Sequence, residues 1–358
     1  MAPGAAPVAV DAMGGDHAPT AVVQGAVDAA RQGQAVVLVG HEERVRTELK
    51  RLRASASLPV EVMHAPEVVE MDDHPGRAMR SKKANSIRVC LELVRSGSAS
   101  AMVSAGNSGA VMAGAILVLG RSGHVERPAI LSVLPAVKGS PVLLDVGANV
   151  ECRPVHLVQF ALMGDVYSRR VLGVSRPRVA VLANGEEATK GTSLTRTAAA
   201  ALERSSLRFQ GYCEGRDLLA GDLDVVVTDG FTGNVALKTM EGTARAIGVL
   251  VREALQRDVP SKIGGMLAKN ALDAMRRRID WREVGGALLV GVNGVAVISH
   301  GASDARAVGN AIGRAREAAR AHCTREMGEA AGLAAELLSI GGETRSSQGR
   351  RRRAPLEA

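Results

Sequence analysis

Short apolar runs of strand length alternate along the chain with longer stretches whose apolar residues recur at helical spacing. This alternation predicts strands that are each followed by a helix, which is the arrangement of an α/β protein with a largely parallel sheet. We expect strands at residues 8–12, 36–39, 60–63, 101–103, 127–134, 141–145, 179–182, 224–229, 287–292 and 295–299. The expected helices cover residues 19–31, 42–54, 86–95, 110–119, 154–172 and 260–278, with another from residue 193 and one that follows the loop 230–234 and runs to about residue 255. Ser303 and Asp304 are expected to cap a final helix that runs to about residue 321.

The stretch 101–119 combines a buried strand, a loop of small residues and an apolar helix. The N–H groups at the start of such a helix lack backbone acceptors, and with the helix dipole they attract anions such as phosphate. Gly106 and Gly109 allow a ligand to approach closely, while Asn107 and Ser108 offer side-chain donors. The alternative is an ordinary strand–helix connection, since no Gly-Lys-Ser/Thr sequence follows to make a P-loop.

Four of the expected strands end in polar residues. Because the carboxyl ends of parallel strands lie at one edge of a sheet, we expect these side chains to converge on a single cleft. They are Asn107, Asp145 with Asn149, Glu187 with Lys190, and Asp229 with Asn234.

Two further segments carry charged groups near the same edge. The loop after the first strand holds Asp11, Asp16 and His17, which would bind a ligand or a metal ion, or simply cap the next helix. Residues 65–85 are expected to be irregular and form either a solvated face or a lid over an anion. Their basic side chains are Arg77, Arg80, Lys82 and Lys83.

Residues 260–278 form a basic amphipathic helix by their pattern. Its apolar positions include Ile263, Met266 and Leu267, its margin includes Lys269, and Trp281 follows it. Such a helix can lie on an anionic membrane surface. The alternative is a helix that packs on the core or on a dimer partner.

Composition narrows the class of protein. The chain has 358 residues, is 46% hydrophobic and 2% aromatic, and carries a net charge of +8. The charge permits acidic partners, but the scarcity of aromatic side chains counts against nucleic acid. The four cysteines form no CxxC pair, which counts against a zinc site and favours a reducing cytosol. We expect neither a signal peptide nor a membrane span.

Several loop sequences occur in an order that resembles one family. The resemblance covers roughly residues 8–322, and it is to the bacterial phosphate acyltransferase (PlsX) family of phospholipid synthesis. The motifs are Val-Asp-Ala-Met-Gly-Gly-Asp at 10–16, Ser-Ala-Gly-Asn-Ser-Gly-Ala at 104–110, Leu-Asp-Val-Gly-Ala-Asn at 144–149, Gly-Glu-Glu at 185–187 with Lys-Gly at 190–191, Thr-Asp-Gly-Phe-Thr-Gly-Asn at 228–234, Gly-Gly at 285–286, and Gly294 with Ser-His-Gly at 299–301. The chain departs from the family at Asn184, which is shifted by one residue, and we carry no role over to it.

The resemblance implies a reaction in which acyl-[acyl carrier protein] and inorganic phosphate give acyl phosphate and free carrier protein. It implies a three-layer αβα fold similar to isocitrate and isopropylmalate dehydrogenases, a homodimer, and no metal or nucleotide cofactor. The product would pass to a membrane-bound glycerol-3-phosphate acyltransferase, so we expect a cytoplasmic protein that associates peripherally with the membrane. The expected catalytic unit is residues 8–322, with residues 250–283 as a helical insertion, residues 324–358 as a tail, and residues 345–358 disordered.

Phosphate is itself the nucleophile in this reaction, so the chain needs to position reactants and stabilise an oxyanion rather than supply a catalytic triad. We expect Lys190 and the loop of Ser104, Gly106, Asn107, Ser108 and Gly109 to bind phosphate. Asn149 and Asn234 would orient or polarise the thioester carbonyl, while Asp145, Glu187 or Asp229 would keep the phosphate correctly protonated. We assign substrate binding to Asp11, Gly14, Gly15, Asp16, Arg77, Lys82 and Arg127.

Three other functions fit parts of the pattern. A phosphotransacetylase-like enzyme would use acyl-coenzyme A in place of the carrier protein. A metal- and NAD-dependent dehydrogenase would share the implied fold, but no close set of metal-ligating aspartates is evident in the sequence. A membrane-surface scaffold would act through residues 262–281 alone.

Overall fold

The computed structural model describes residues 6–339, apart from the side chains of residues 277, 279 and 281. The strands are β1 (Val8–Asp11), β2 (Val36–Gly40), β3 (Val60–His64), β4 (Ala101–Ser104), β5 (Ala129–Val133), β6 (Val142–Leu144), β7 (Arg178–Leu182), β8 (Arg208–Cys213), β9 (Val225–Val227), β10 (Ala287–Val290) and β11 (Ala296–Ile298). The α-helices are α1 (Thr20–Arg31), α2 (Glu42–Arg51), α3 (Pro75–Ser81), α4 (Ser86–Arg95), α5 (Ser108–Val118), α6 (Pro154–Arg170), α7 (Ser193–Leu202), α8 (Gly230–Gln256), α9 (Val259–Leu267), α10 (Lys269–Ile279), α11 (Trp281–Val284), α12 (Ala305–Arg320) and α13 (Thr324–Ala331).

All eleven strands belong to one sheet, in the order β3-β2-β1-β4-β11-β10-β5-β6-β9-β7-β8. Seven of its ten strand pairings are parallel, as the alternating pattern predicted. Two pairs of consecutive strands, β5 with β6 and β10 with β11, are antiparallel. The predicted α/β class with a largely parallel sheet is confirmed.

The direction of the strands changes in the middle of the sheet. β4 is parallel to β11, but β11–β10, β10–β5 and β5–β6 are all antiparallel. Three reversals leave β6, β9 and β7, which are parallel to one another, running opposite to β4. The carboxyl ends of β6, β9 and β7, with the polar residues that follow them, therefore point in the direction opposite to the carboxyl end of β4. Below, an edge of the sheet means the side on which one of these two sets of carboxyl ends lies.

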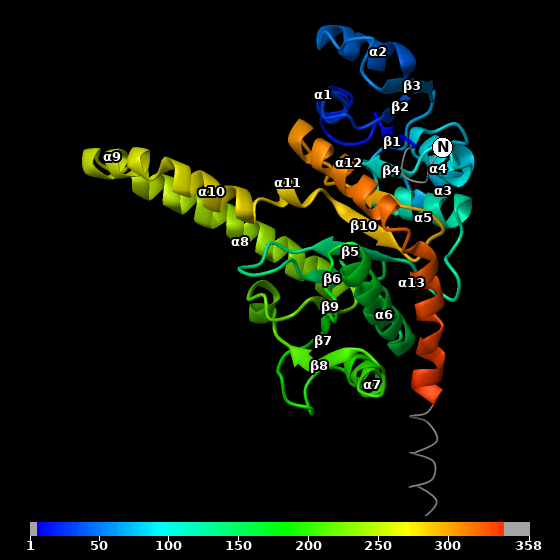
Figure 1. The fold of residues 1–358 in the computed structure, drawn as a ribbon, viewed down its shortest axis with the longest axis vertical. Helices are drawn as coiled ribbons and strands as arrows, with labels where there is room; N and C mark the ends of the chain where they lie inside the picture. Colours follow the sequence, from blue (N-terminus) through cyan, green and yellow to red (C-terminus); the bar gives the residue numbers. More distant parts are fainter. Residues whose placement is uncertain (1–5, 340–358) are drawn as a thin grey trace, which may run out of the picture.

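Helices cover both faces of the sheet and complete three layers (Figure 1). On one face, α1, α6, α7, α12 and α13 bury Val27, Phe160 and Ile312 against the strands. On the other face, α3, α4, α5 and the first part of α8 bury Met79, Leu91 and Val111. The alternate side chains of each strand supply the two cores, because successive residues of a strand point to opposite faces.

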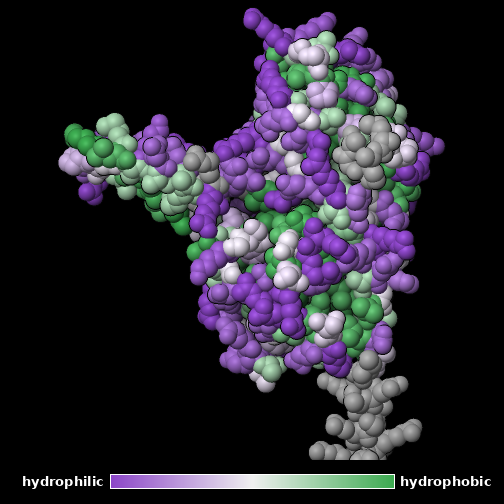
Figure 2. All heavy atoms as spheres, viewed as in Figure 1, coloured by the Kyte–Doolittle hydropathy of each residue, from purple (hydrophilic) through white to green (hydrophobic). Residues whose placement is uncertain are grey.

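Helices α8, α9 and α10 form an arm that projects from the body (Figure 1). The pattern predicted one helix over residues 260–278, but the chain forms α9 and α10 with a break at Ala268. Only Gly230 and Gly233 are buried along the 27 residues of α8. The arm therefore exposes much of its apolar surface, which Figure 2 shows as apolar atoms toward the tip.

The segment after residue 322 does not begin as a loose tail. Helix α13 packs along α6 and buries Met327 and Ala331 in the core, and residues 333–339 are also helical. Arg169 and Arg170 of α6 both pair with Glu326. The expectation of disorder at 345–358 falls outside the described residues.

Candidate functional site

The first strand and the fourth strand are joined by Asp11, which is 1% exposed. Its Oδ2 accepts a hydrogen bond from Ser104 Oγ at 2.7 Å, and its Oδ1 accepts from Met13 N at 3.1 Å. Burial raises the pKa of Asp11, against the lowering effect of its hydrogen bonds. The expectation that Asp11 contacts substrate is wrong, because this carboxyl lies beneath the surface and holds two loops together.

Three loops meet above that carboxyl. A Cβ on Gly14 would lie 2.7 Å from Gly106 N, so only glycine permits this contact between the β1 and β4 loops. Gly15 has φ +100°, and the next residue, Asp16, donates its N–H to Gly301 O at 2.8 Å. The predicted loops after β1 and β4, and the motif after β11, therefore do come together. We call Asp11, Gly14, Ser104 and Gly106 the β1–β4 cluster.

Asn107 uses its side chain within the protein. Its Oδ1 caps α5 by accepting from Ala110 N at 3.0 Å. Its Nδ2 lies 3.3, 3.1 and 3.2 Å from the carbonyl oxygens of Glu70, Met71 and Asp73. The expectation that this side chain donates to phosphate is therefore wrong: Asn107 fastens the 65–85 segment to the start of α5.

The 65–85 segment lies against the start of α5 and contains the helix α3. Pro75 Cγ is 2.7 Å from the position that a Cβ on Gly109 would occupy. Lys82 Nζ donates to Asp73 Oδ2 at 2.5 Å and to Val68 O at 2.8 Å, so two of its three N–H groups stabilise the segment. Arg77 remains exposed, as does Ser108 in the first turn of α5.

At the opposite edge, Asp145 follows β6 and is 0% exposed. Its Oδ1 accepts from the N–H groups of Ile130, Gly147 and Ala148 at 3.0, 3.1 and 3.0 Å. Its Oδ2 accepts from Asn149 N at 2.7 Å and from Asn149 Nδ2 at 2.9 Å. Burial raises the pKa of Asp145, but five donors favour its ionised form. Asp145 therefore organises the loop and does not face substrate as expected.

Asn149 joins this loop to two neighbouring segments. Its Nδ2 also donates to Pro128 O at 2.8 Å, so both amide hydrogens are used within the protein. Its carbonyl oxygen accepts from Gly230 N at 2.8 Å, at the start of α8. The expected donation from the Asn149 amide to a thioester carbonyl is wrong; the residue positions α8 against the β6 loop.

The start of α8 presents the polar groups that remain accessible. Asp229 caps the helix, with Oδ1 accepting from Thr232 N and Oδ2 from Thr232 Oγ1, both at 2.8 Å. Asn234, one turn later, is exposed and lies near Gly147, whose Cβ position would be 3.9 Å from Asn234 Oδ1. We call Asp145, Asn149, Asp229 and Asn234 the β6–β9 cluster.

The loop after β7 lies at the same edge, because β7 pairs in parallel with β9. Lys190 Nζ is 3.9 Å from Glu187 Oε2, and their side chains are 43% and 68% exposed. Asn184 accepts from Gly191 N at 2.9 Å and so closes this loop. Lys190 is thus a solvent-facing cation that a bound anion can reach.

The predicted residues consequently fall into two groups. The β1–β4 cluster and the start of α5 follow strands of one direction, while the β6–β9 cluster and Lys190 follow strands of the opposite direction. The prediction of convergence on a single cleft assumed that every strand ran in the same direction, and that assumption is wrong.

Sequence reasoning missed a group of side chains beneath the β6–β9 cluster. His156, 1% exposed, accepts from Arg153 N at 3.1 Å and holds Nε2 3.3 Å from Glu126 Oε2. Burial and two neighbouring arginines lower the pKa of His156. Arg127, predicted to bind substrate, is exposed and donates one hydrogen bond, from Nη1 to Glu151 O at 3.3 Å. No motif marks these residues, since their partners are 24 to 30 positions away.

Cys152 lies beside the same cluster, with Sγ 3.6 Å from Asn149 O. Burial and the charges of Asp145 and Asp229 raise its pKa to about 11. A thiol with so high a pKa is a poor nucleophile at neutral pH. This residue is therefore unsuited to carry an acyl group as a covalent intermediate.

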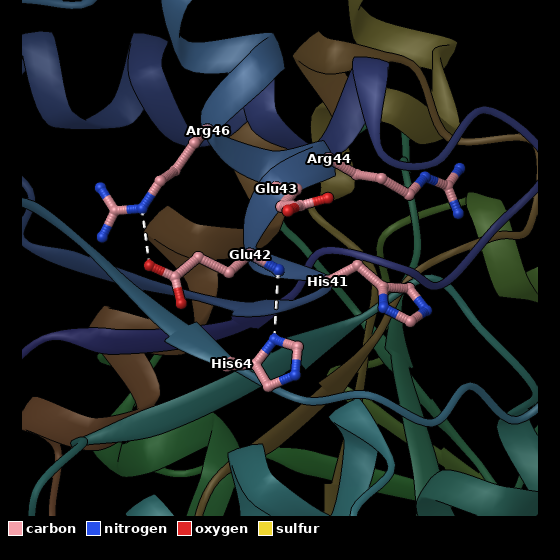
Figure 3. A pocket seen from close by; sticks show the side chains of 6 residues that line it. All are labelled: His41, Glu42, Glu43, Arg44, Arg46 and His64. Carbon is pink, nitrogen blue, oxygen red and sulfur yellow. Dashed lines mark hydrogen bonds and ion pairs between the residues drawn. The ribbon is translucent and has the colours of Figure 1, made fainter.

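One surface hollow lies away from the residues assigned to the site. This hollow, of about 640 Å³, is lined by side chains at the ends of β2 and β3 and the start of α2, where Glu42 N approaches His64 Nδ1 at 3.4 Å (Figure 3). Its lining residues are His41, Glu42, Glu43, Arg44, Arg46 and His64. Among the described residues, no group of three His, Cys, Asp or Glu side chains is placed to hold a metal ion.

The model of a family described as "Fatty acid synthesis protein" matches residues 6–325. A phosphate acyltransferase of Anaeromyxobacter sp. (strain Fw109-5) is 69% identical over 333 residues, covering 93% of each chain. A phosphate acyltransferase of Myxococcus xanthus is 52% identical over 335 residues, covering 92% of this chain and 94% of that one.

Solved structures with low sequence identity share the fold. A phosphotransacetylase from Streptococcus pyogenes superposes with a TM-score of 0.57 at 16% identity, covering 88% of this chain and 94% of that chain. A 4-hydroxythreonine-4-phosphate dehydrogenase from Klebsiella pneumoniae gives 0.54 at 16% identity, covering 88% and 99%. At 16% sequence identity, these superpositions show only that the fold is shared.

Proposed function

The chain belongs to the phosphate acyltransferase family and is an acyltransferase, and from this premise we propose that its acyl donor is acyl-[acyl carrier protein]. A phosphate oxygen attacks the thioester carbonyl, the tetrahedral oxyanion collapses, and the carrier-protein thiolate leaves as acyl phosphate forms. The observation that supports direct transfer to phosphate is the group of exposed polar side chains after β7 and β9, namely Glu187, Lys190 and Asn234, beside the Cys152 thiol, whose pKa is raised to about 11. Such a site positions reactants rather than forming a covalent intermediate.

We propose that Lys190 binds phosphate and that Asn234 donates to the thioester carbonyl, because both side chains face solvent at the same edge. Glu187 and Asp229 are the nearby carboxylates that would hold the proton of the phosphate. Asp145 and Asn149 position these groups from below. The start of α5, with Ser108 exposed in its first turn, is the proposed second contact for the anion.

Because the two groups of residues follow strands of opposite direction, we propose a homodimer in which each site takes one group from each protomer. The apolar face of α8 supports this arrangement, because Phe231 is 62% exposed, Val235 51% and Leu250 63%. Such side chains on a helix that starts at the β6–β9 cluster favour burial against a partner. A two-fold interface presents the same patch from both chains.

The carrier protein is acidic, so we expect exposed basic side chains beside α5 to speed its docking. Replacing Arg77 and Lys83 together by Glu should lower kcat/KM for acyl-[acyl carrier protein] about 10-fold at low salt. The same enzyme should use acyl-coenzyme A as the wild type does. The loss should shrink as ionic strength rises, because exposed charges are screened.

The control is Arg95→Glu, which reverses one positive charge, half of the change in the double variant, at the end of α4. An unchanged rate with the carrier protein in the Arg77/Lys83 variant would remove this segment from docking. If wild-type enzyme preferred acyl-coenzyme A, the phosphotransacetylase-like alternative would replace the proposed donor.

We further propose that the tip of the arm contacts an anionic membrane surface. Ile263, Met266 and Leu267 of α9 are 49%, 69% and 84% exposed, and Lys269 beside them is also exposed. Apolar side chains with a basic margin favour the interface of an anionic bilayer. No helix within residues 6–339 is long and apolar enough to cross the bilayer. The side chain of Trp281, predicted as a further contact, lies outside the described part.

Replacing Met266 and Leu267 by Glu should lower the fraction that sediments with phosphatidylglycerol vesicles by about 10-fold, because each change removes an apolar contact and adds repulsion. Acyl transfer in solution should persist. Val137→Glu, at a residue 66% exposed on the body, is the control. Sedimentation of the double variant at the wild-type level would exclude the tip as the contact, and loss of soluble transfer would point to a different role for α9.

A further inference from the structure

One buried side chain joins three segments that are distant in sequence. Gln159 lies in the middle of α6 and is 3% exposed. Its Oε1 accepts from Glu126 N at 2.9 Å, and its Nε2 donates to His124 O at 2.9 Å and to Ala331 O at 3.2 Å. A buried amide that satisfies its donors and its acceptor in this way fixes the relative position of all its partners. Here those partners are α6, the loop 122–128 and the end of α13.

Helix α13 also contacts the loop 122–128 directly. Ser122 Oγ donates to Thr324 O at 2.9 Å, and His124 N donates to Gly328 O at 3.2 Å. A Cβ on Gly328 would lie 2.5 Å from Ser122 Oγ and 3.0 Å from Gly123 N. The helix and the loop therefore touch backbone to backbone, which leaves no room for the smallest side chain.

The other side of the loop 122–128 holds the β6–β9 cluster. Pro128 O accepts from Asn149 Nδ2 at 2.8 Å, and Ile130 N donates to Asp145 Oδ1 at 3.0 Å. Glu126 faces His156 Nε2 at 3.3 Å. Displacing this loop would shift the two residues that set the start of α8.

We infer that α13 is a brace for the active site: it presses the loop 122–128 into place and so positions Asn149 and Asp145, with Gln159 as the positioning residue. This inference rests on the proposed role of the β6–β9 cluster in acyl transfer. The path runs from Gly328 to the loop, from Pro128 O to Asn149, and from Asn149 O to Gly230 N. Each step is a close contact of buried groups.

Gly328→Ala distinguishes an effect of α13 on the position of the active site from an effect on the stability of the fold. Alanine favours the helical state over glycine, so α13 itself becomes a better helix, while the added Cβ pushes the loop away. We expect kcat to fall about 10-fold or more, because a displacement near 1 Å has effects of this size. The KM for phosphate should change less than about twofold, since Lys190 is not on the path.

Gly313→Ala in α12 is the matched control, because a Cβ there meets nothing within 4 Å. A Gly313→Ala enzyme with wild-type kcat is required for the comparison. A wild-type kcat in Gly328→Ala overturns the brace, and so does an equal fall in both variants.

Gln159→Leu gives a second test that does not depend on turnover. Amide exchange should quicken at Glu126 N, which loses its acceptor, and also at Asn149 N, which is remote from Gln159 but on the path. Quickened exchange at Glu126 with unchanged exchange at Asn149 overturns the inference, even if Gly328→Ala fails to fold. Absence of acyl phosphate formation by the wild type would refute the proposed function and leave this exchange result to be judged separately.

Discussion

Lys190→Ala should raise the KM for phosphate or lower kcat by ~10- to 1000-fold, the range seen when one donor to a developing anion is removed. Lys190 is 43% exposed and its nearest carboxylate, on Glu187, is 3.9 Å away, so no buried charge is left unpaired. The fold should therefore be unaffected, and circular dichroism and urea unfolding should match the wild type. Steady-state rates at limiting and saturating phosphate make the measurement. An unchanged rate at limiting phosphate would remove Lys190 from the site.

Lys190→Ala, combined with a second variant, also tests whether two chains share one site. Ser108→Asp places a negative charge in the first turn of α5, where it suits the helix dipole but repels phosphate. Each variant alone should be nearly inactive. Random mixing of the two should restore about 25% of wild-type activity, because half of the dimers are mixed and each of these has one intact site. No recovery after verified subunit exchange would mean that the edges do not join across the dimer.

Asp145→Asn should lower the free energy of unfolding by about 2–6 kcal/mol, the largest loss of stability that we expect from one substitution. The carboxylate accepts from five donors, two at Oδ2 and three at Oδ1. The amide group of asparagine accepts on one side only, so at least two buried donors lose their acceptor at about 1–3 kcal/mol each. Urea unfolding of the two proteins measures the difference.

The control is Asp229→Asn, which makes the same chemical change at a partly exposed helix cap. Asparagine caps a helix about as well as aspartate does, so the stability should change by less than about 0.5 kcal/mol. A similar loss in both variants would show that the Asp145 network is worth no more than an ordinary cap. A small loss in Asp145→Asn alone would mean that the loop can rearrange around the amide.

The sequence predicted the elements well because each strand–helix unit is local. The alternation of periods marked most strands and helices, and Asp304 as the cap of α12 was predicted from its position and is confirmed by its bond from Ala307 N. Strand β8 and helices α3, α11 and α13 were missed, since short or weakly periodic segments resemble loops. Helix α13 is fixed by tertiary packing rather than by its own pattern.

The directions of the strands could not be predicted from the sequence, for a physical reason. The decisive pairing is β5 with β10, which joins Ile130 to Leu289, 159 positions later (289 − 130), and no local signal marks it. A shorter separation, of 34 to 37 positions, likewise hid the partners of Asn107, whose amide donates to the carbonyl oxygens of Glu70, Met71 and Asp73. A polar residue after a strand marks the neighbourhood of a site, but only its long-range partners decide whether its side chain is free for a ligand.

The central claim is that this chain moves an acyl group from a carrier-protein thioester to inorganic phosphate. The most direct measurement mixes the purified chain with acyl-[acyl carrier protein], with and without phosphate, and traps acyl phosphate with hydroxylamine. We predict loss of the thioester and formation of acyl hydroxamate only when phosphate is present. Loss of the thioester at the same rate without phosphate, or no loss with phosphate present, would contradict the account.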